Sequence, residues 1–576
     1  MTSALSKDKT TPLGDALAMG KSALIFAALF SLASNLLYLA LPIYTNQIYS
    51  RVLSSHSGST LIVLTVGAML VFLVSGLLDH YRMQVLINFG VAFDRRLASN
   101  TFAALFDLVV RRKGGSQAQA LRDLDMVRSM ISGTGTAVLF DVPWIPVFLG
   151  ILFVIDPWIG AFTLLGGVIL LILAFLQDRA THSALKQQSQ ASIKSYSFTD
   201  AALRNAEIVR ALGMLPTLGA AWAHFRQVAL QMGIVANERS SFYAAAIRFI
   251  RMVVQIGIIA LGAWLIIIGS INGGLLFANM ILSSRALAPI DRIMGSWKAL
   301  IEGVQAYKRL EKILDDYEPP VPTTQLPTPT GRITFEGVSF APQGAASLVI
   351  VNMSAMIAPS EMVGVIGPSG AGKSTMLRLM TGIWKPSTGA VRLDGADVYS
   401  WDRADFGRQV AYQPQDTELF AGTVRANICR FAAHADDAEI VKAAQAAGAH
   451  DLILRLPKGY ETELGDSGVT LSAGQRQRVG LARTLYGEPK VIILDEPNAN
   501  LDAEGEAALL KALEGAKARG ATIIMVSHKP SMFASADKLM VLRNGQITHY
   551  GPRDEVLRVL QGGPPQQRPP LAEVKS

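Results

Sequence analysis

Long uncharged apolar runs dominate the first half of the chain, whereas the second half alternates short apolar and polar runs. A membrane-spanning helix needs about 20 mostly apolar residues. Five runs reach about this length, the last of them interrupted by one carboxylate: 22–44, 60–78, 157–177, 252–270 and 134–155. A sixth run at 271–284 is apolar but short, so hydropathy alone predicts five spans and favours a sixth only weakly. The first run is longer than the about 7 to 15 apolar residues of a cleavable signal peptide, so we expect it to remain as a membrane helix.

Lys and Arg residues fall on one side of the predicted membrane. The connections 80–133 and 178–245 carry eight and seven of them, whereas Arg51 is the one basic residue between the first two spans. Because basic residues collect in cytoplasmic loops, both long connections and both termini are predicted to be cytoplasmic. The same bias accounts for the net charge of +8 without a nucleic-acid partner. The single cysteine, Cys429, excludes a disulfide-built secreted fold.

The two long connections are predicted to be helical extensions of the spans. The segment 80–133 contains no proline, and 178–245 contains only Pro216. Half of such a connection is about 25 to 34 residues, which is roughly 40 to 50 Å of helix at 1.5 Å per residue. We therefore expect these helices to project well into the cytoplasm.

Proline marks the boundary between the two halves of the chain. Five prolines between Tyr317 and Thr330 favour an extended connector. From Gly331 onward short β-like runs alternate with helical ones, which indicates an α/β domain. The tail is rich in Pro, Gly and Gln, which is typical of disorder. We predict an N-terminal cytoplasmic segment, a transmembrane domain, a linker, an α/β domain and a disordered tail: 1–21, 22–317, 318–330, 331–560 and 561–576.

The first motif with a chemical function in the second half of the chain is a glycine-rich phosphate loop. The segment 367–374 matches the pattern G-x-x-x-x-G-K-[ST], between a predicted buried strand at 362–366 and a helix from Lys373. Glycines let backbone N–H groups turn toward a polyanion. Lys373 is expected to meet the β- and γ-phosphates of a nucleotide, and Ser374 a magnesium ion. The predicted nucleotide-binding residues of this loop are Gly367, Pro368, Ser369, Gly370, Ala371, Gly372, Lys373, Ser374 and Thr375.

Two adjacent acids and one histidine follow predicted strands. Asp495 and Glu496 end the apolar run 491–494, and two acids in this place can divide the work between a Mg²⁺ ligand and a group that polarises the attacking water. His528 follows the β-like run 522–526. A lone histidine is more often structural, but strand ends in this class of sheet point at the ligand crevice.

A second anion site is predicted at the start of another helix. Ser472 and the backbone near Gly474 precede the helical run 476–485, whose N-terminus favours negative charge. With these motifs in this order, the region from Phe335 to about Gly551 resembles an ATP-binding-cassette (ABC) nucleotide-binding domain. The motif at this second site corresponds to the family's signature and consists of Leu471, Ser472, Ala473, Gly474 and Gln475.

The resemblance implies a role for each matching residue. Gln415, in Tyr412-Gln-Pro-Gln415, matches the glutamine that reaches Mg²⁺ and the attacking water. Glu496 matches the catalytic base, His528 the histidine that senses the γ-phosphate, and Asp502 the turn that communicates across the dimer. The implied Mg²⁺ ligands are Ser374, Gln415 and Asp495. In this family ATP is held between the phosphate loop of one domain and the signature of its partner, so one such domain per chain implies a homodimer.

Two positions depart from the family pattern. Ala473 replaces the first glycine of the signature, and its methyl group is costly if that residue needs a positive φ. Pro342 stands where the family usually stacks adenine on a tyrosine, so stacking on the base is either weaker or supplied by Phe340.

The spans resemble those of a six-helix ABC exporter, which implies an all-α transmembrane domain followed by an α/β P-loop domain. Nearly the whole chain is similar to the alkaline-protease and lipase (PrtD-type) exporters of type I secretion. This resemblance supports a sixth span through about Pro289. It rests on 124–128, 132–135, 140–146, 285–290 and 497–502.

Type I secretion implies a location and partners. The chain is expected in the bacterial inner membrane, in contact with membrane lipid, a periplasmic adaptor and an outer-membrane channel. Its expected cargo is an unfolded protein with a C-terminal secretion signal. About 21 residues precede the first span, so a leader-cleaving peptidase domain is not expected.

Three charged residues are candidates for a substrate path. Asp141 lies within the predicted third span, where carboxylates are costly and usually face a cavity or partner. The equally weighted alternative is a carboxylate that caps a helix broken by Pro143 and Pro146. Arg248 and Arg251 share a helix face at the foot of the fifth span, where they either guide substrate or reach toward lipid headgroups.

Three functions remain open at this point. The leading hypothesis is an ATP-hydrolysing protein exporter. The second keeps the ATPase but makes the cargo a lipid, a peptide or a drug. The third is an ATP-gated channel or regulator that does not hydrolyse ATP, against which the presence of Glu496 and His528 argues.

Overall fold

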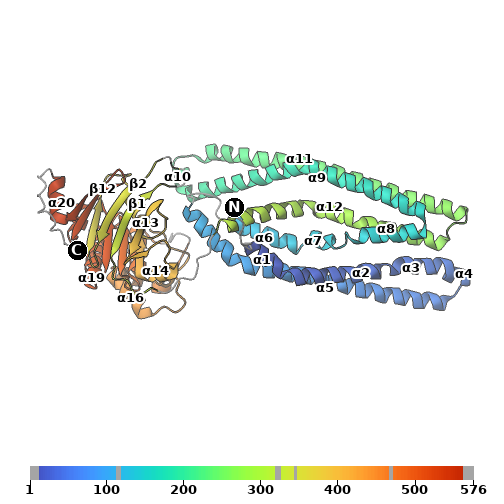
Figure 1. Ribbon diagram of the computed structural model, residues 1–576, viewed down its shortest axis with the longest axis horizontal. Helices are drawn as coiled ribbons and strands as arrows, with labels where there is room; N and C mark the ends of the chain where they lie inside the picture. The colour runs from blue at the N-terminus through green and yellow to red at the C-terminus, as the bar shows by residue number, and fades with distance from the viewer. Residues whose placement is uncertain are drawn as a thin grey trace, which may run out of the picture. The chain divides into compact units, whose positions relative to one another are not determined.

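The computed structural model describes residues 12–111, 119–317, 326–342, 345, 347–465 and 471–561. The chain divides into two units, Met1–Pro319 and Pro320–Ser576. The first is helical and the second contains all the described strands (Figure 1). The predicted linker falls partly, and the predicted tail almost entirely, outside the described residues, at 318–325 and 562–576.

The first unit is a bundle of long helices. Its described helices are α1 (Pro12–Met19), α2 (Lys21–Tyr38), α3 (Ala40–Gln47), the π-helix η1 (Ile48–Val52), α4 (Leu53–Ser55), α5 (Gly58–Arg111), α6 (Gln119–Ile131), α7 (Thr134–Leu139), α8 (Trp144–Ile155), α9 (Pro157–Arg204), α10 (Ala206–Ala211), α11 (Leu215–Ile267) and α12 (Gly273–Asp315). The described parts of the long connections are mostly helical, because α5, α9 and α11 continue far beyond their apolar runs.

Five helical stretches among the described residues are long and apolar enough to cross a membrane: Lys21–Ser55, Gly58–Val110, Pro157–Arg204, Leu215–Ile267 and Gly273–Asp315. Two of the predicted spans need comment. The predicted span 134–155 breaks at 140–143 between α7 and α8, beside Pro143. The short run 271–284 belongs mostly to α12, a helix of 43 residues that continues through Pro289, as the resemblance implies.

Small residues let the helices approach closely. A Cβ at Gly166 of α9 would lie 2.5 Å from Val254 Cγ2 of α11, and a Cβ at Gly257 of α11 would lie 2.4 Å from the ring of Phe162. Glycine at such positions is the usual device for close packing of membrane helices, where the hydrophobic effect between helices is absent. The α9–α11 pair therefore packs along its length, and α2 packs against α5 in a second pair (Figure 1).

The second unit is built around a six-stranded sheet in the order β12-β11-β3-β10-β9-β6, with β12 antiparallel to its neighbour. A four-stranded antiparallel sheet, β2-β1-β4-β5, packs beside it. The described strands are β1 (Ile333–Phe340), β2 (Ile350–Ile357), β3 (Met362–Ile366), β4 (Thr388–Leu393), β5 (Ala396–Asp397), β6 (Val410–Gln413), β7 (Gly422–Thr423), β8 (Glu463–Leu464), β9 (Val491–Asp495), β10 (Thr522–Val526), β11 (Lys538–Arg543) and β12 (Gln546–Pro552).

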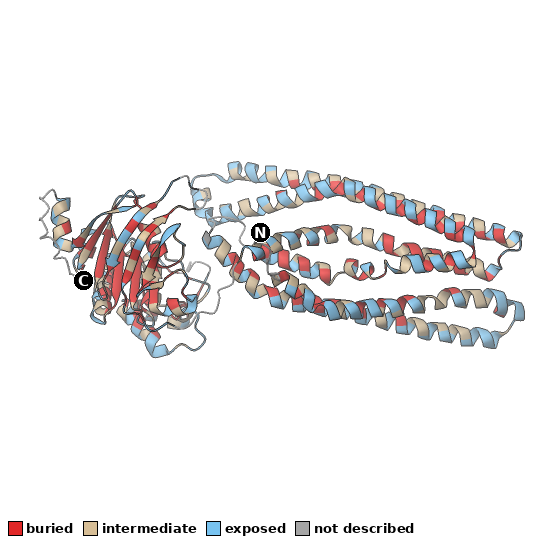
Figure 2. Ribbon diagram, in the orientation of Figure 1, coloured by how far each residue is buried: buried red, intermediate tan, exposed pale blue. Residues whose placement is uncertain are grey.

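The helices of this unit pack against the six-stranded sheet or against one another. They are α13 (Lys373–Met380), α14 (Arg403–Gln409), α15 (Val424–Ile428), α16 (Asp437–Ala446), α17 (His450–Leu454), η2 (Gly459–Glu461), α18 (Ala473–Leu485), α19 (Ala503–Ala518), η4 (Pro530–Phe533) and α20 (Arg553–Leu560). Two separate apolar cores lie against the sheet, and its central strands β9 and β10 are buried throughout (Figure 2). This burial explains why these strands are continuous apolar runs in the sequence.

The parallel pairing of the strands determines where the candidate site lies. Strand β10 runs parallel between β3 and β9, with Val526 aligned with Val365 on one side and with Asp495 on the other. The carboxyl ends of these three strands therefore meet at one edge, where parallel α/β sheets bind their ligands. The loops that leave this edge are 367–372, 496–502 and 527–529.

Candidate active site

The phosphate loop joins β3 to α13 and depends on glycine. Gly372 has φ 97°, and a Cβ there would lie 2.8 Å from Ile350 Cδ1. A Cβ at Gly367 would lie 2.3 Å from the carbonyl oxygen of Leu542. Lys373 begins α13 and curls back, so that its ammonium donates to the carbonyls of Gly367 at 2.8 Å and Pro368 at 3.0 Å. The loop thus combines a helix N-terminus with a fixed positive charge, which is a site for phosphate.

Asp495 lies directly beside this loop at the end of β9. It is 3% exposed, and its carboxylate is hydrogen-bonded to the hydroxyl of Ser374. Burial raises the pKa of Asp495 above its ordinary value, and the charge of Glu496 acts in the same direction. The bond from Ser374 and the positive charges of Arg378 and Lys373 oppose this shift without cancelling it.

A hydroxyl beside a buried carboxylate fits magnesium. Mg²⁺ prefers oxygen ligands and usually takes one or two carboxylates together with substrate phosphates. The part of the chain that the structure describes has no group of three or more His, Cys, Asp or Glu side chains able to hold a metal ion. The donor set of Ser374 and Asp495 therefore fits an ion that arrives with a nucleotide better than a permanently bound metal.

Glu496 is the centre of a polar cluster at the same edge. Its backbone is left-handed, with φ 49°, and its N–H donates to the carbonyl of Val526 at 3.0 Å. Gln415 Nε2 donates to Glu496 Oε2 at 3.1 Å, and His528 Nε2 lies 3.2 Å from Glu496 Oε1. The structure thus brings together three predicted residues that come from three distant parts of the sequence.

The signature motif lies at the N-terminus of α18. Ser472 caps this helix by accepting from the N–H of Gln475 at 3.2 Å, and Gln475 Oε1 accepts from the N–H of Ser472 at 2.9 Å. Ala473 is the first residue of α18 and does not have a positive φ. The condition under which its methyl group is costly therefore does not arise. Leu471 is buried, and its carbonyl accepts from Arg476 at 2.8 Å.

Asp502 caps the helix that follows the acidic turn. Its carboxylate accepts from the N–H of Gly505 at 2.8 Å and lies 3.0 Å from Arg478 Nη2. The bond from Gly505 and the charge of Arg478 hold the pKa of Asp502 below its ordinary value. Asp502 is thus tied to α18, the helix that begins with the signature.

Phe340 packs at the end of β1. It is 8% exposed, and its ring stacks on Trp384, with ring centres 5.2 Å apart and an angle of 12° between planes. The guanidinium of Arg378 lies 4.8 Å from the centre of the Trp384 ring. Phe340 is part of the apolar core between the sheets. Its contact with adenine stays a prediction.

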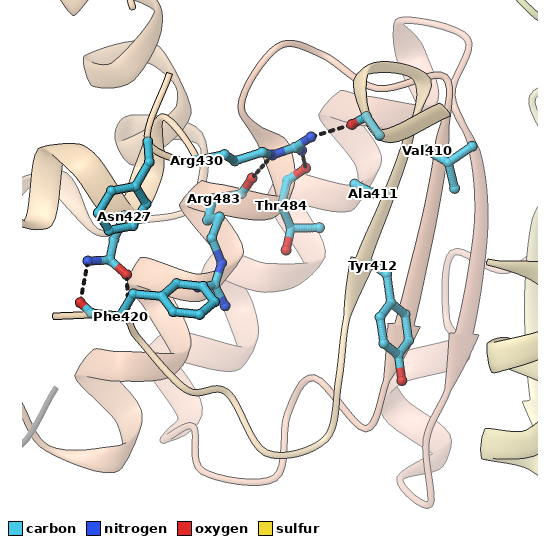
Figure 3. Close-up of a pocket in the computed structure, with 10 residues that line it drawn as sticks. Val410, Ala411, Tyr412, Phe420, Asn427, Arg430, Arg483 and Thr484 are labelled. Carbon is cyan, nitrogen blue, oxygen red and sulfur yellow. Dashed lines mark hydrogen bonds between the residues drawn. The ribbon is translucent and has the colours of Figure 1, made fainter. Parts of the chain in front are cut away.

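A cavity of about 300 Å³ lies apart from this cluster, between β6 and α18 (Figure 3). Its apolar wall includes Phe420 and Phe431, and its polar wall includes Arg430 and Arg483. Arg430 donates to the carbonyls of Arg483 at 3.1 Å and Thr484 at 3.3 Å. Burial lowers the pKa of both arginines. The sequence carried no signal for this cavity, because its lining residues other than Tyr412 come from segments without a motif.

In the membrane unit, Asp141 lies in the break between α7 and α8 and is 6% exposed. Its Oδ1 accepts from Arg82 Nη1 at 2.8 Å, Ser31 Oγ at 2.9 Å and Asn35 Nδ2 at 3.1 Å. Arg292 lies 3.7 Å from its Oδ2. These contacts join Asp141 to α2 and α5, and α8 has no side-chain cap at its N-terminus, so they do not support the capping alternative.

Arg248 and Arg251 do not act as a pair. Arg251 lies against Asp291 of α12 and donates to Ser284 Oγ at 3.3 Å. Arg248 is exposed on α11. The two arginines therefore have different surroundings, although they lie three residues apart.

Comparison with known proteins agrees with this geometry. Residues 24–289 match the ABC transporter transmembrane region, and residues 350–499 match the ABC transporter domain. The chain is 42% identical over 559 residues to the type I secretion system ATP-binding protein PrsD of Rhizobium meliloti, covering 96% of this chain and 95% of PrsD. The chain is an ABC transporter of the type I secretion group. It is therefore an ATP-hydrolysing, multi-pass membrane transporter.

More distant relatives of the transporter cover nearly all of its length. The cyclolysin secretion/processing ATP-binding protein CyaB of Bordetella pertussis is 30% identical, over 92% of this chain and 75% of CyaB. The leukotoxin translocation ATP-binding protein LktB of Mannheimia haemolytica is 26% identical, over 93% of this chain and 76% of LktB. The structure of a bacterial Atm1-family ABC exporter with ATP bound matches the fold with a TM-score of 0.82 at 24% identity, over 94% of this chain and 97% of that chain.

Proposed function

We propose that this transporter is the ATP-hydrolysing inner-membrane component of a type I secretion system, that it exports an unfolded protein, and that both its termini are cytoplasmic. Similarity to PrsD over almost the whole of both chains supports the secretion role, as do the more distant relatives that are named for the secretion or translocation of toxins. The observation that carries the ATPase is the cluster of Gln415 and His528 on the carboxylate of Glu496.

Binding of ATP is assigned to the phosphate loop. The Lys373 ammonium and the N–H groups at the start of α13 face the position for the β- and γ-phosphates. Ser374, Asp495 and Gln415 would hold Mg²⁺. When bound, this ion neutralises charge on the phosphate oxygens. The remaining residues 368–371 and Thr375 shape the loop.

Hydrolysis is assigned to Glu496. Its carboxylate accepts the proton of the attacking water, and a general base of this kind contributes about 10² to 10⁴ in rate. Gln415 and His528 each contact one carboxylate oxygen, so together they set its orientation. His528 is 57% exposed at its side chain, which leaves it accessible to the γ-phosphate.

The signature acts on the nucleotide of a second copy of the chain. Ser472 and the N-terminus of α18 form an anion site that its own phosphate loop does not use. A homodimer completes two such sites, with Asp502 on the turn between them. The further partners are a periplasmic adaptor and an outer-membrane channel, and the cargo carries a C-terminal signal.

Secretion assays test this function. The chain would be produced with an adaptor, a channel and a candidate cargo, with and without the last residues of the cargo. We expect export to require this chain, the adaptor and the channel, together with the C-terminus of the cargo and Glu496. Transport of a lipid, peptide or drug without adaptor and channel would overturn the protein-export proposal. Export that survives Glu496→Gln would overturn the assignment of the base.

A further inference from the structure

The turn from Glu496 to Asp502 is held from the side of β10. The N–H of Glu496 donates to Val526, as described above, and Asn498 Oδ1 accepts from Ser527 Oγ at 3.0 Å. Asn498 and Ser527 are buried, at 7% and 1% exposure. Because Ser527 precedes His528, this side of the turn is fixed to the strand end that carries the histidine.

The opposite side of the same turn is held by Gln477 of α18. Gln477 is 2% exposed. Its Nε2 donates to the carbonyl of Pro497, and its Oε1 accepts from the N–H of Asn500 at 3.2 Å. One side chain thus bonds to the residue directly after Glu496 and to a residue three positions further along.

Neighbouring residues of α18 reinforce this contact. Arg478 pairs with Asp502 at the end of the turn. A Cβ at Gly474 would lie 2.9 Å from the carbonyl oxygen of Asn500, so the first turn of the helix packs against the same segment without spare space. The helix and the turn therefore have little room to move independently.

The side-chain amide of Gln477 is buried, and both its nitrogen and its oxygen are hydrogen-bonded. It therefore fixes both the distance and the orientation of α18 relative to the turn. The bond to the Pro497 carbonyl is buried, and the bond from the Asn500 N–H is part-buried. If the first bond breaks, a buried carbonyl of the turn loses its partner, which is more costly than the loss of an exposed bond. A displacement of α18 is consequently transmitted to Pro497, and through one peptide bond to Glu496. Ser472 of the signature is the N-cap of α18.

We propose that Gln477 is a positioning residue that ties the signature, which serves the ATP of the partner copy, to the base that hydrolyses the ATP of its own copy. This inference rests on the proposed function, in which the signature acts across the dimer. Gln477 does not touch the reacting atoms and acts through Pro497 and Asn500.

The test is steady-state ATP turnover by the full chain in lipid nanodiscs. Gln477→Met keeps a similar volume and removes both bonds. Because a small misplacement of reacting groups costs up to about 100-fold, we expect turnover to fall by about 10- to 100-fold. The KM for ATP should remain close to that of the unaltered chain, since the phosphate loop is unchanged, and the Hill coefficient should fall toward one.

Thr381→Val is the matched control. Thr381 is 5% exposed, and its hydroxyl donates to the carbonyls of Leu377 at 3.1 Å and Arg378 at 3.0 Å within α13. The substitution removes a buried hydrogen bond that lies away from the turn. We expect its unfolding midpoint to fall as in Gln477→Met, with turnover retained.

Gln477→Glu provides a graded variant. It keeps the acceptor for Asn500 and loses the donor for Pro497, so we expect turnover between those of the unaltered chain and Gln477→Met. Turnover by Gln477→Met equal to that of the unaltered chain, or an equal loss in Thr381→Val, would overturn the positioning role. Failure of the proposed function would show instead as absence of ATP turnover in the unaltered chain.

Discussion

His528 Nε2 lies 3.2 Å from Glu496 Oε1, while the other carboxylate oxygen of Glu496 accepts from Gln415. Both oxygens of the proposed base are thus engaged by side chains from β-strand ends or the loop after β6. This arrangement fixes the carboxylate without burying it, since the Glu496 side chain is 24% exposed. A base held in this way can receive a proton from water at a defined position.

Replacing Glu496 by Gln should abolish most ATP turnover. The amide keeps the size of the side chain but does not accept a proton, so we expect a fall of about 10² to 10⁴ in kcat. ATP binding, measured by equilibrium titration, should persist because Lys373 is unaffected. Glu488→Gln is the control, since Glu488 pairs with Lys442 at 2.7 Å outside the site. Turnover within a few-fold of the unaltered chain in Glu496→Gln would contradict the base assignment.

Asp495→Asn should stabilise the chain without nucleotide while it lowers turnover. The pKa of Asp495 is raised by burial, so the folded chain binds this proton more tightly than the unfolded chain. Stability is therefore lost as pH rises from the ordinary aspartate pKa of about 4 through the raised value, and the loss is complete above it. We expect a higher unfolding midpoint for Asp495→Asn at neutral pH and no difference near pH 4.

Asp502→Asn is a control for which we expect the opposite change in the unfolding midpoint. The pKa of Asp502 is lowered by the N–H of Gly505 and by Arg478, so its charge stabilises the fold at neutral pH. This stabilisation is lost as pH falls through the lowered value. The unfolding midpoint of Asp502→Asn should therefore fall at neutral pH. A lower midpoint for Asp495→Asn at neutral pH would contradict the first assignment.

Asp141→Asn should destabilise the membrane unit more than the loss of an exposed ion pair. It removes one of two carboxylates paired with Arg82, whose side chain is 9% exposed and keeps Asp79 at 3.2 Å, so we expect a loss below the about 3 to 5 kcal/mol of a buried pair broken from one side. Asp125→Asn breaks the exposed pair with Arg128, with side chains 63% and 44% exposed, where about 0 to 1 kcal/mol is expected. Thermal unfolding of both variants in nanodiscs makes the comparison. Equal midpoints would show that the Asp141 pair does not secure the break.

Ala473→Gly and Gly474→Ala should behave differently, although they are neighbours in the signature. Ala473 needs no positive φ, so Ala473→Gly should retain turnover and lose at most about 1 kcal/mol of stability. Gly474→Ala places a Cβ 2.9 Å from the Asn500 carbonyl, so the turn must shift and turnover should fall. Turnover assays on both variants decide the matter. A greater loss of turnover in Ala473→Gly would contradict this assignment.

Local pattern was sufficient to predict much of the site. The glycines of the loop, Lys373 and the acids after β9 each follow an element that their own segment encodes, and parallel pairing then brings the strand ends together. Their grouping with Gln415 followed from resemblance, since no local signal links residues 81 positions apart. Gln477 could not be found in this way, because its role depends on the path of a distant turn.

Hydropathy predicted the spans least well where contacts with other helices accommodate charged residues and prolines. The run 134–155 is apolar enough to predict one span, but Pro143 ends the regular hydrogen bonding and Asp141 finds partners on other helices. The run 271–284 appeared too short because polar residues follow it in α12. One of them, Asp291, is paired with Arg251 of α11 inside the bundle.

The interruption between α7 and α8 has a consequence for the work of the transporter. The hydroxyl of Ser31 has one proton, which lies between the Phe140 carbonyl at 3.0 Å and Asp141 Oδ1 at 2.9 Å, so α2 replaces one of the hydrogen bonds that an unbroken helix would make for itself. Hydrocarbon offers no substitute for these bonds. The first, second and third spans should consequently travel as a single body through each cycle of the transporter.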